Sequence, residues 1–549
     1  MDFTIAFFIA LCFVLSITAL FAFIWSLGNE GKSILHGDGN IIFDEQELGK
    51  SEEPAIDGPL PLARDKARSV ETVNYHSGTE DEINTRVAID TSSRLPVVMF
   101  LTSALFWLVL GSVAGVLVSL KFHFPDFLVN NIELTFGRIR PVHLNAVVYG
   151  WSAMAGVGVV LWLLPRLLKT ELVGGRYAVS SCILWNIALL IGAYQILTGH
   201  TQGMEFLEVP WHTDILIIFA GAMVAVPLFL TLAQRKTEHL YVSGWYFSAA
   251  LIWFPVIFFI GNVPGIFTGA EQAIVNWWFG HNILGLWVTP IAVGCAYYFI
   301  PKVLGVSVYS YRLSLIGFWA LALFYSQVGI HHLLGGPVPM WLQTMSIVQS
   351  VMMLIPITAF LINMYSILKG RWSVVKYSPT LRFMLIGAAM YAGASVQGTF
   401  EAIRSVNYLV HFTHYTVAHA HLGLYAFFTM IMFGAMYFVL PRVTQSEWPY
   451  PKLISWHFWL SLLGISLYFV ALTIAGIKQG FALADPSIPF IESMKVTIPY
   501  LELRSVAGIM MTLSHIIFAW HFFAIILKKR SEKMANSSQK SASLNLKEA

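Results

Sequence analysis

The feature that most constrains this chain is a succession of long apolar segments separated by short polar loops. A transmembrane helix needs about 20 consecutive apolar residues. Only 11% of the 549 residues are charged, and apolar and polar residues do not alternate regularly, which argues against a membrane β-barrel. We therefore predict an all-α polytopic membrane protein with spans at 3–27, 95–120, 141–168, 176–199, 211–234, 240–262, 273–300, 309–334, 341–368, 380–404, 409–440, 453–477 and 501–527.

The distribution of Lys and Arg predicts the orientation of these spans. Every second short loop is basic, whereas the loops at 200–210, 263–272 and 335–340 contain neither Lys nor Arg. Cytoplasmic loops are the ones enriched in basic residues. The N-terminus is therefore expected outside and the C-terminus in the cytoplasm. The net charge of +3 is spread over these loops, so it indicates no nucleic-acid site.

The segments outside the main apolar region are predicted to be accessory. Residues 1–27 are expected to form an N-terminal membrane anchor, since they lack the basic start and the cleavage site of a signal peptide. Residues 28–94 have the composition of an acidic cytoplasmic linker, and 531–549 that of a disordered cytoplasmic tail. The cysteines show no CxxC spacing, and the absence of CxxCH excludes c-type haem attached to this chain.

Six histidines lie in four of the spans, where ionisable side chains are rare and usually functional. The alternating span directions bring all six to the outer third of the membrane. Each one alone could be a polar core residue bonded to a neighbouring carbonyl, but six at one depth favour a metal or haem site. They are His143, His281, His331, His332, His419 and His421.

Helical spacing divides these histidines among different centres. Residues two apart on an α-helix point about 200° from each other, so His419 and His421 can serve two centres on opposite faces. Adjacent residues differ by about 100°, so His331 and His332 can reach one ion together. With His281 they form a ligand set suited to copper. Histidines at span edges or in the last two spans are predicted not to be ligands: His212, His411, His414, His457, His515 and His521.

Four motifs resemble those of the catalytic subunit of haem-copper oxygen reductases, most closely the cbb3-type cytochrome c oxidase. They are GRIRPVHLNAVVYGW, WWFGHNILG, the segment from Tyr325 to His332, and VAHAHLGLY. The resemblance covers 95–530 and implies a twelve-helix bundle, to which the first span adds one helix. It also implies a terminal oxidase of the bacterial cytoplasmic membrane that reduces dioxygen to water, coupled to proton uptake or translocation. Electrons would come from c-type cytochrome subunits and a cytochrome c-like donor.

The same resemblance assigns cofactors to the histidines. It implies two haem b groups, one low-spin and one high-spin, and one copper. The axial ligands of the low-spin haem would be His143 and His421, that of the high-spin haem His419, and the copper ligands His281, His331 and His332. Arg140 and His411 would pair with haem propionates. Glu205 and Glu208 resemble the region that binds a structural calcium.

Tyr325 is the residue that separates the possible chemistries. It precedes His332 by seven residues, about 700° of α-helical rotation, so the two are expected to share a helix face, with Tyr325 roughly 10 Å nearer the cytoplasm. In cbb3-type enzymes a tyrosine at this place is cross-linked to the first copper histidine, here His281. The resemblance therefore implies that Tyr325 and His281 are catalytic. The alternative is a packing tyrosine.

A proton path from the cytoplasm is also implied by the resemblance. Tyr297, Ser314 and Tyr391 match the positions of the single proton channel of the cbb3-type enzymes, with uptake near Tyr309 and Tyr311. A hydroxyl can both donate and accept a hydrogen bond, as a proton path requires. The alternative is that these hydroxyls satisfy backbone groups between helices.

The chain departs from the family pattern at Gln397, where cbb3-type subunits carry a glutamate in a phenylalanine-glutamate-glycine context. Glu401 follows one turn later, within roughly 40° of the same face and some 6 Å nearer the outer surface. We predict that Glu401 takes over a role in proton handling or beside the propionates. The alternative is a solvated acid at the outer end of the span.

The N-terminal extension resembles the small single-span assembly protein of the cbb3 system. The anchor is followed by WSLGNEGKSILHGDGNIIFDEQE, in which Phe43-Asp44-Glu45 would be the phenylalanine-aspartate motif. The resemblance implies a fused assembly module, whereas the alternative is an ordinary extra anchor.

Two other functions remain open from the residues. A nitric-oxide reductase uses the same scaffold with non-haem iron, but its family places a glutamate four residues after the first metal histidine, where this chain has Gly285. That family also lacks the tyrosine. A proton-coupled transporter would not need paired histidines at one depth.

Overall fold

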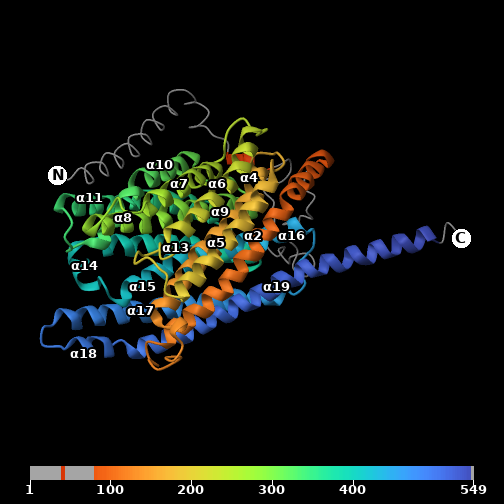
Figure 1. The fold of residues 1–549 in the computed structure, drawn as a ribbon. Helices are drawn as coiled ribbons and strands as arrows, with labels where there is room; N and C mark the ends of the chain where they lie inside the picture. Colours follow the sequence, from red (N-terminus) through yellow and green to blue (C-terminus); the bar gives the residue numbers. More distant parts are fainter. Residues whose placement is uncertain (1–38, 44–78, 546–549) are drawn as a thin grey trace.

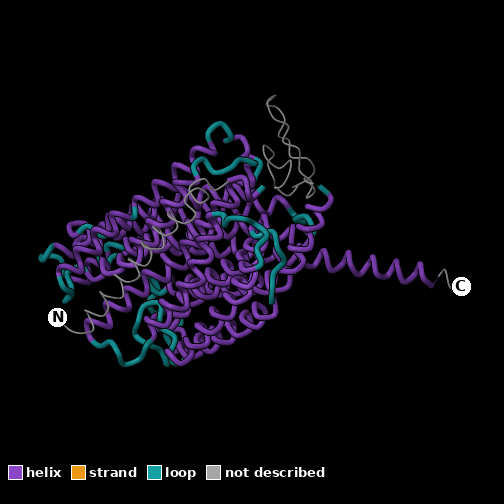
Figure 2. The backbone as a smooth tube through the Cα atoms, turned by 90° about the horizontal axis from the view of Figure 1, so that it is seen from above, coloured by secondary structure: helices purple, strands orange, loops and turns teal. Residues whose placement is uncertain are grey.

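The computed structural model describes residues 39–43 and 79–545. Helices form almost all of this part of the chain, and no strand occurs in it, as Figure 2 shows. Within the described residues, twelve helices are long and apolar enough to cross a membrane. They confirm the all-α fold and the twelve predicted spans from 95 onwards. The first span, 3–27, lies outside the described residues.

The helices run nearly parallel in one bundle, with α17 and α19 packed along one side and α19 projecting beyond it (Figure 1). The bounds are α2 Glu80–Leu120, α3 Phe136–Asn145, α4 Ala153–Leu167, α5 Gly175–Leu197, α6 Trp211–Ala233, α7 Val242–Asn262, α8 Gly269–Asn282, α9 Thr289–Leu304, α10 Tyr311–Phe324, α11 Met340–Met352, α12 Leu354–Leu368, α13 Pro379–Glu401, α14 Arg404–Val410, α15 His414–His421, α16 Met430–Thr444, α17 Pro451–Ala484, α18 Phe490–Lys495 and α19 Ile498–Asn545.

Helices extend beyond both boundaries predicted for the region 95–530. Helix α2 begins at Glu80, inside the predicted linker, because Thr79 and Glu82 form a capping box that satisfies the first free N–H groups. The linker prediction followed the acidic composition, which is also suited to a first helical turn. At the other end, the backbone of α19 continues as helix to Asn545, where a disordered tail was predicted.

Three composite spans form the centre of the bundle, and each carries a π-helical segment just after a histidine. The spans Phe136–Leu167 and Gly269–Leu304 are the most completely buried, followed by His414–Thr444. The π segments are η3 Ala146–Ser152, η4 Ile283–Val288 and η7 Leu422–Thr429, which follow His143, His281 and His421. Such segments are rare in proteins and concentrate at functional sites.

A short piece of the N-terminal extension packs against the bundle. The 3-10 turn η1, Gly39–Ile42, and the following Phe43 contact the end of α9 and the loop after it. This loop belongs to the basic set that predicted the cytoplasmic side. Residues 39–43 therefore lie at the same end of the bundle as this loop, while Asp44 and Glu45 of the proposed motif lie outside the described residues.

Candidate haem and copper site

Three histidines from two elements form a compact cluster. His281 comes from α8, and His331 and His332 from the 3-10 segment η5, Tyr325–Leu333. One ring nitrogen of each lies within 4.8 Å of those of the other two. Nitrogens that bind one ion at about 2 Å each lie at most about 4 Å apart, so a shift of less than about 1 Å would let the three bind a single ion. The predicted copper ligands therefore come together in space.

Hydrogen bonds leave these imidazoles free to bind a metal. The Ser350 hydroxyl donates to the Ser346 carbonyl, so it accepts the Nδ1–H of His331 at 2.9 Å and leaves Nε2 unprotonated. Nδ1 of His281 is buried without a hydrogen-bond partner among the described residues. A buried polar atom without a partner costs free energy, and a metal ion would satisfy it. The cluster fits the implied ion.

The local structure around Tyr325 differs from the prediction. The α-helix α10 ends at Phe324, and Tyr325 to Leu333 form a 3-10 helix with about three residues per turn. Tyr325 and His332 therefore do not share a face through the α-helical rotation expected from their spacing. The Tyr325 ring nevertheless lies beside His281, with ring centroids 5.1 Å apart and planes inclined by 52°.

Gly285 is the residue that lets Tyr325 approach. A Cβ atom at this position would overlap the Tyr325 ring, so no side chain fits there while the tyrosine keeps its place. A glutamate four residues after His281 is therefore sterically incompatible with this tyrosine position.

A second pair of histidines faces each other across a gap. The rings of His143 and His421 are inclined by only 14°, and their centroids are 6.4 Å apart. If both rings bound one iron through metal–nitrogen bonds of about 2 Å, their centroids would be about 6 Å apart. The Nδ1–H of His143 donates to the Gly111 carbonyl and that of His421 to the Val417 carbonyl. These bonds orient the rings, as they do in metal-binding histidines.

Glycines make room for the rings of His143 and His419. The hydroxyl of Tyr468 lies close to the nitrogen of His421 that would bind iron. A Cβ at Gly115 would lie 2.8 Å from the His143 ring, and one at Gly398 would lie 2.9 Å from the His419 ring. The Tyr468 hydroxyl approaches Nε2 of His421 at 3.2 Å. An iron ligated by this nitrogen requires that hydroxyl to turn away.

His419 faces away from His421, as the spacing on α15 predicted. Its Nε2 lies 3.9 Å from a carboxylate oxygen of Glu401 at the end of α13. Glu401 is only 5% exposed, so the alternative of a solvated acid is wrong for this structure. Gln397, one turn earlier, is also buried and supplies no charge.

One cavity of about 610 Å³ joins these groups. All six predicted histidines line it, together with Tyr325, Tyr391, Arg140 and His411. Burial lowers the pKa of His411, so it is a neutral hydrogen-bonding group at neutral pH. The cavity is large enough for a cofactor-sized ligand. The other residues predicted for proton handling, Tyr297, Ser314 and Glu401, lie outside its lining.

Several residues of the cavity wall were not predicted from the sequence. Arg504 lines the cavity and is only 5% exposed, held by the hydroxyl and carbonyl of Ser119. An arginine inside the apolar segment 501–527 was itself a signal of function, by the rule applied to the histidines. Ser350 and Tyr468 gave no such signal, because hydroxyls are common in membrane helices.

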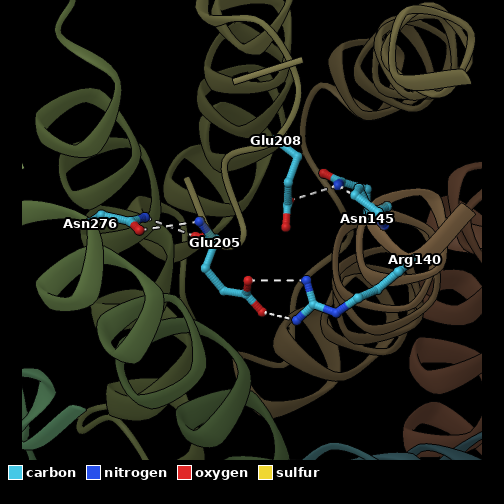
Figure 3. A network of polar contacts seen from close by, with 6 residues as sticks. Arg140, Asn145, Glu205, Glu208 and Asn276 are labelled. Atoms are coloured by element: carbon cyan, nitrogen blue, oxygen red, sulfur yellow. Dashed lines mark hydrogen bonds and ion pairs between the residues drawn. The ribbon is translucent and has the colours of Figure 1, made fainter. Parts of the chain in front are cut away.

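The two carboxylates proposed for calcium lie beside Arg140 (Figure 3). Both oxygens of Glu205 accept from the guanidinium of Arg140, at 2.5 and 3.2 Å. Glu208 accepts from the amide of Asn145 at 3.0 Å, and its other oxygen is buried without a hydrogen-bond partner among the described residues. Arg140 thus supplies a positive charge at the place proposed for the cation.

The proposed proton path is only partly connected. The Asn363 amide donates weakly to the Tyr297 hydroxyl at 3.5 Å, and its oxygen accepts from the N–H of Ser310 at 2.8 Å. Ser314 donates to the Tyr311 carbonyl on its own helix. This is the backbone-satisfying alternative named for that residue. Asn363 lies between Ser310 and Tyr297 and was not identified from the sequence.

Two of the histidines predicted not to be ligands have hydroxyl partners, whereas both ring nitrogens of His521 are buried without a hydrogen-bond partner among the described residues. His457 shares a hydrogen bond with the Tyr437 hydroxyl. Both ring nitrogens of His515 are engaged, by the Ser112 and Tyr425 hydroxyls, although His515 lines the cavity. Its nitrogens are therefore not available to a metal in this arrangement.

Comparison with known proteins agrees with this geometry. Residues 95–510 match the family model described as cytochrome C and quinol oxidase polypeptide I. The cbb3-type cytochrome c oxidase subunit CcoN1 of Stutzerimonas stutzeri is 32% identical over 438 residues, covering 77% of this chain and 92% of the relative. A nitric oxide reductase chain of the same organism is more distant, at 25% identity over 78% of this chain and 92% of the relative.

The fold is that of a solved structure as well. A haem-copper terminal oxidase dimer matches with a TM-score of 0.62 over 80% of this chain and 84% of that chain, at 16% identity. Family membership implies haem and copper, other subunits of a complex, and a multi-pass place in the bacterial inner membrane. By sequence, fold and histidine arrangement, the chain is a member of the cytochrome c and quinol oxidase polypeptide I family, of the cbb3-type catalytic subunits.

Proposed function

We propose that this chain is the catalytic subunit of a terminal oxidase that reduces dioxygen to water. The observation that carries this proposal is the Tyr325 ring beside His281 in the three-histidine cluster, with His419 on the wall of the same cavity. Four electrons and four protons are needed for each dioxygen. A phenol at this place can give one electron and one proton without waiting for transfer from elsewhere.

The histidines divide into three ligand sets in this proposal. His143 and His421 hold a low-spin haem b, His419 holds a high-spin haem b, and His281 with the doublet holds one copper. When bound, the haem iron and the copper supply a binuclear centre for dioxygen. The chain orients the imidazoles through Ser350 and backbone carbonyls, and its apolar walls limit access of water.

The test is an optical spectrum combined with metal analysis of the purified protein. We expect two b-type haems and one copper per chain, with carbon monoxide binding only one haem. Iron without copper would instead indicate a nitric-oxide reductase, and a colourless protein would indicate a transporter. The steric fit of Gly285 against Tyr325 favours the oxidase, since a reductase-type glutamate and this tyrosine position exclude each other.

Arg140, Arg504 and His411 are proposed to receive the haem propionates. The two arginines line the cavity as positive charges, and guanidinium groups bind carboxylates strongly. Calcium remains a proposal for Glu205 and Glu208. A cation there would compete with Arg140 for the Glu205 carboxylate, so its binding should be weaker than at a site with two free carboxylates.

Glu208 should make stability depend on pH. Burial, reinforced by the charge of Glu205, raises the pKa of Glu208 from 4.5 to about 7. The folded chain therefore favours the protonated carboxyl, and its stability falls as pH rises from about 4.5 to about 7, by about 3 kcal/mol. Glu208→Gln is expected to flatten the melting temperature across this range. The control is the exposed Glu492→Gln, and an unchanged pH profile in Glu208→Gln would contradict the assignment.

Glu401 is proposed to handle protons or support the propionate side in place of the family glutamate. Its carboxylate lies near His419, and Gln397 cannot titrate. We expect Glu401→Gln to lower oxygen consumption by roughly tenfold or more and to change proton release in vesicles. The exposed Glu502→Gln is the matched control. If Glu401→Gln kept both turnover and proton stoichiometry, relocation would be excluded.

The surroundings of the site follow from the same proposal. Electrons arrive from c-type cytochrome subunits and a cytochrome c-like donor. Protons enter from the cytoplasm towards Tyr325 through Tyr297 and Tyr391, with Asn363 as an added link. The N-terminus lies outside, the C-terminus lies in the cytoplasm, and the haem-copper centre lies in the outer third of the membrane.

A further inference from the structure

A five-residue piece of the N-terminal extension, Gly39–Phe43, is docked on the end of α9 and the loop after it. Ile42 and Phe43 are 7% and 8% exposed and join the main hydrophobic core together with Val308 of the loop. This segment lies outside the region matched by the family model, residues 95–510. Its contacts are therefore a property of this chain beyond that shared region.

Lys302 is the polar centre of the contact. The side chain is only 3% exposed, its ammonium donates to the Ile42 carbonyl at 2.8 Å, and it lies 5.3 Å from the centroid of the Phe43 ring. A buried ammonium needs hydrogen bonds or opposite charge, and the face of an aromatic ring also attracts a cation. The docked segment supplies two of these interactions.

The loop is held at a second place. The Ser307 hydroxyl donates to the Asn40 side-chain oxygen, and a Cβ on Gly39 would come within 3.3 Å of Val308. The segment thus follows the loop closely over two consecutive residues, Ser307 and Val308. Burial of the Ile42 and Phe43 side chains stabilises the contact through the hydrophobic effect. A free peptide with so few contacts would bind only with a dissociation constant of about 1 mM. A covalent tether can supply an effective concentration of that order.

The clamped loop leads directly into the proposed proton path. Ser310 follows Val308 by two residues, and its backbone N–H holds the Asn363 oxygen at 2.8 Å. Asn363 in turn points its amide at the Tyr297 hydroxyl. A shift of the loop that displaced Ser310 would break this hydrogen bond to Asn363.

We propose that the loop after α9 is a docking surface for the chain's own segment Gly39–Phe43, and that docking holds Ser310 and Asn363 in the arrangement that delivers protons to Tyr297. The docking itself stands on the contacts alone, whereas its effect on proton delivery rests on the proposed oxidase function. The occupant is a segment of the same polypeptide, recognised by a phenylalanine ring and a backbone carbonyl.

A disulfide between the segment and the loop tests the docking. Asn40→Cys and Ser307→Cys replace two side chains that are hydrogen-bonded, so mild oxidation of the full chain in detergent should cross-link them, as peptide mass spectrometry would detect. Adding Phe43→Ser should lower the cross-linking rate at least about fivefold. Tyr309→Ser, an exposed aromatic in the same loop, should leave it unchanged. Equal rates with and without Phe43 would overturn the docking.

Turnover with and without the cross-link tests the effect on protons. We expect Phe43→Ser alone to lower oxygen consumption about threefold or more with unchanged haem and copper content. Oxidation of the cysteine pair in the Phe43→Ser chain should restore turnover, and reduction should remove the gain. Unchanged turnover in Phe43→Ser, or a loss that the cross-link does not restore, would overturn this effect while leaving the docking intact.

Two results keep the two levels of the proposal apart. If Phe43→Ser lost its cofactors, the test would use the cysteine pair in the otherwise native chain. Full activity of the oxidised, cross-linked chain would support a productive docked state. Loss of activity on oxidation would refute it. If the parent chain contained no copper, the oxidase function would fail, but the cross-linking result would still decide whether the segment docks.

Discussion

Replacement of His281 by alanine is expected to remove copper and to lower turnover on the order of 1000-fold. Two imidazoles from η5 would remain, and the loss of the third opens the ligand set on the side of Tyr325. The low-spin haem spectrum should persist, because the His143–His421 pair is built on α3 and α15. Copper per chain, measured with the spectrum on the same sample, checks both statements.

Two companion variants make this result specific. Ser350→Ala keeps all three imidazoles but removes the acceptor for Nδ1 of His331, so it should weaken copper binding by about 10- to 100-fold without abolishing it. His143→Ala should have the opposite signature, with loss of the low-spin haem and retention of the haem that binds carbon monoxide. A His143→Ala chain with both haem spectra intact would show that the two haem centres are wrongly assigned.

Gly285→Ala is expected to reduce turnover by about 100-fold or more with a single methyl group. The methyl would occupy the space of the Tyr325 ring, so the phenol must move away from His281. The substitution leaves every metal-binding imidazole in the chain. Haem and copper content should therefore remain near the parent value while oxygen consumption falls.

The matched control is Gly317→Ala on α10. A Cβ there meets its nearest atom at 3.6 Å, an ordinary van der Waals contact, so turnover should stay within about twofold. If Gly285→Ala turned over as fast as Gly317→Ala, Tyr325 would not be needed in its observed position. The oxidase proposal would then lose its main support.

Apolar segment length was enough to predict the helical spans, and spacing was enough to predict that His331 and His332 lie close enough for one ion, whereas the pairing of His143 with His421 came from the family resemblance. Both follow from local rules, because a membrane span must be apolar and helical. The 3-10 helix at Tyr325 could not be predicted in this way, since its sequence is compatible with either helix type and packing against α8 decides. Arg504 and Asn363 were likewise invisible as partners, because their roles depend on helices distant in sequence.

A π segment divides each of the three central helices into two halves, and the extra residue in its turn changes the rotation of one half relative to the other. In each helix the half before the π segment carries a histidine that lines the cavity, and the half after it is closely packed in the bundle. A π turn holds one residue more than an α turn, so deleting one residue there is expected to rotate the histidine-bearing half by about 100° relative to the packed half. Geometry at the cofactors can thus be altered by insertion or deletion at these points, where substitution would change only the side chains.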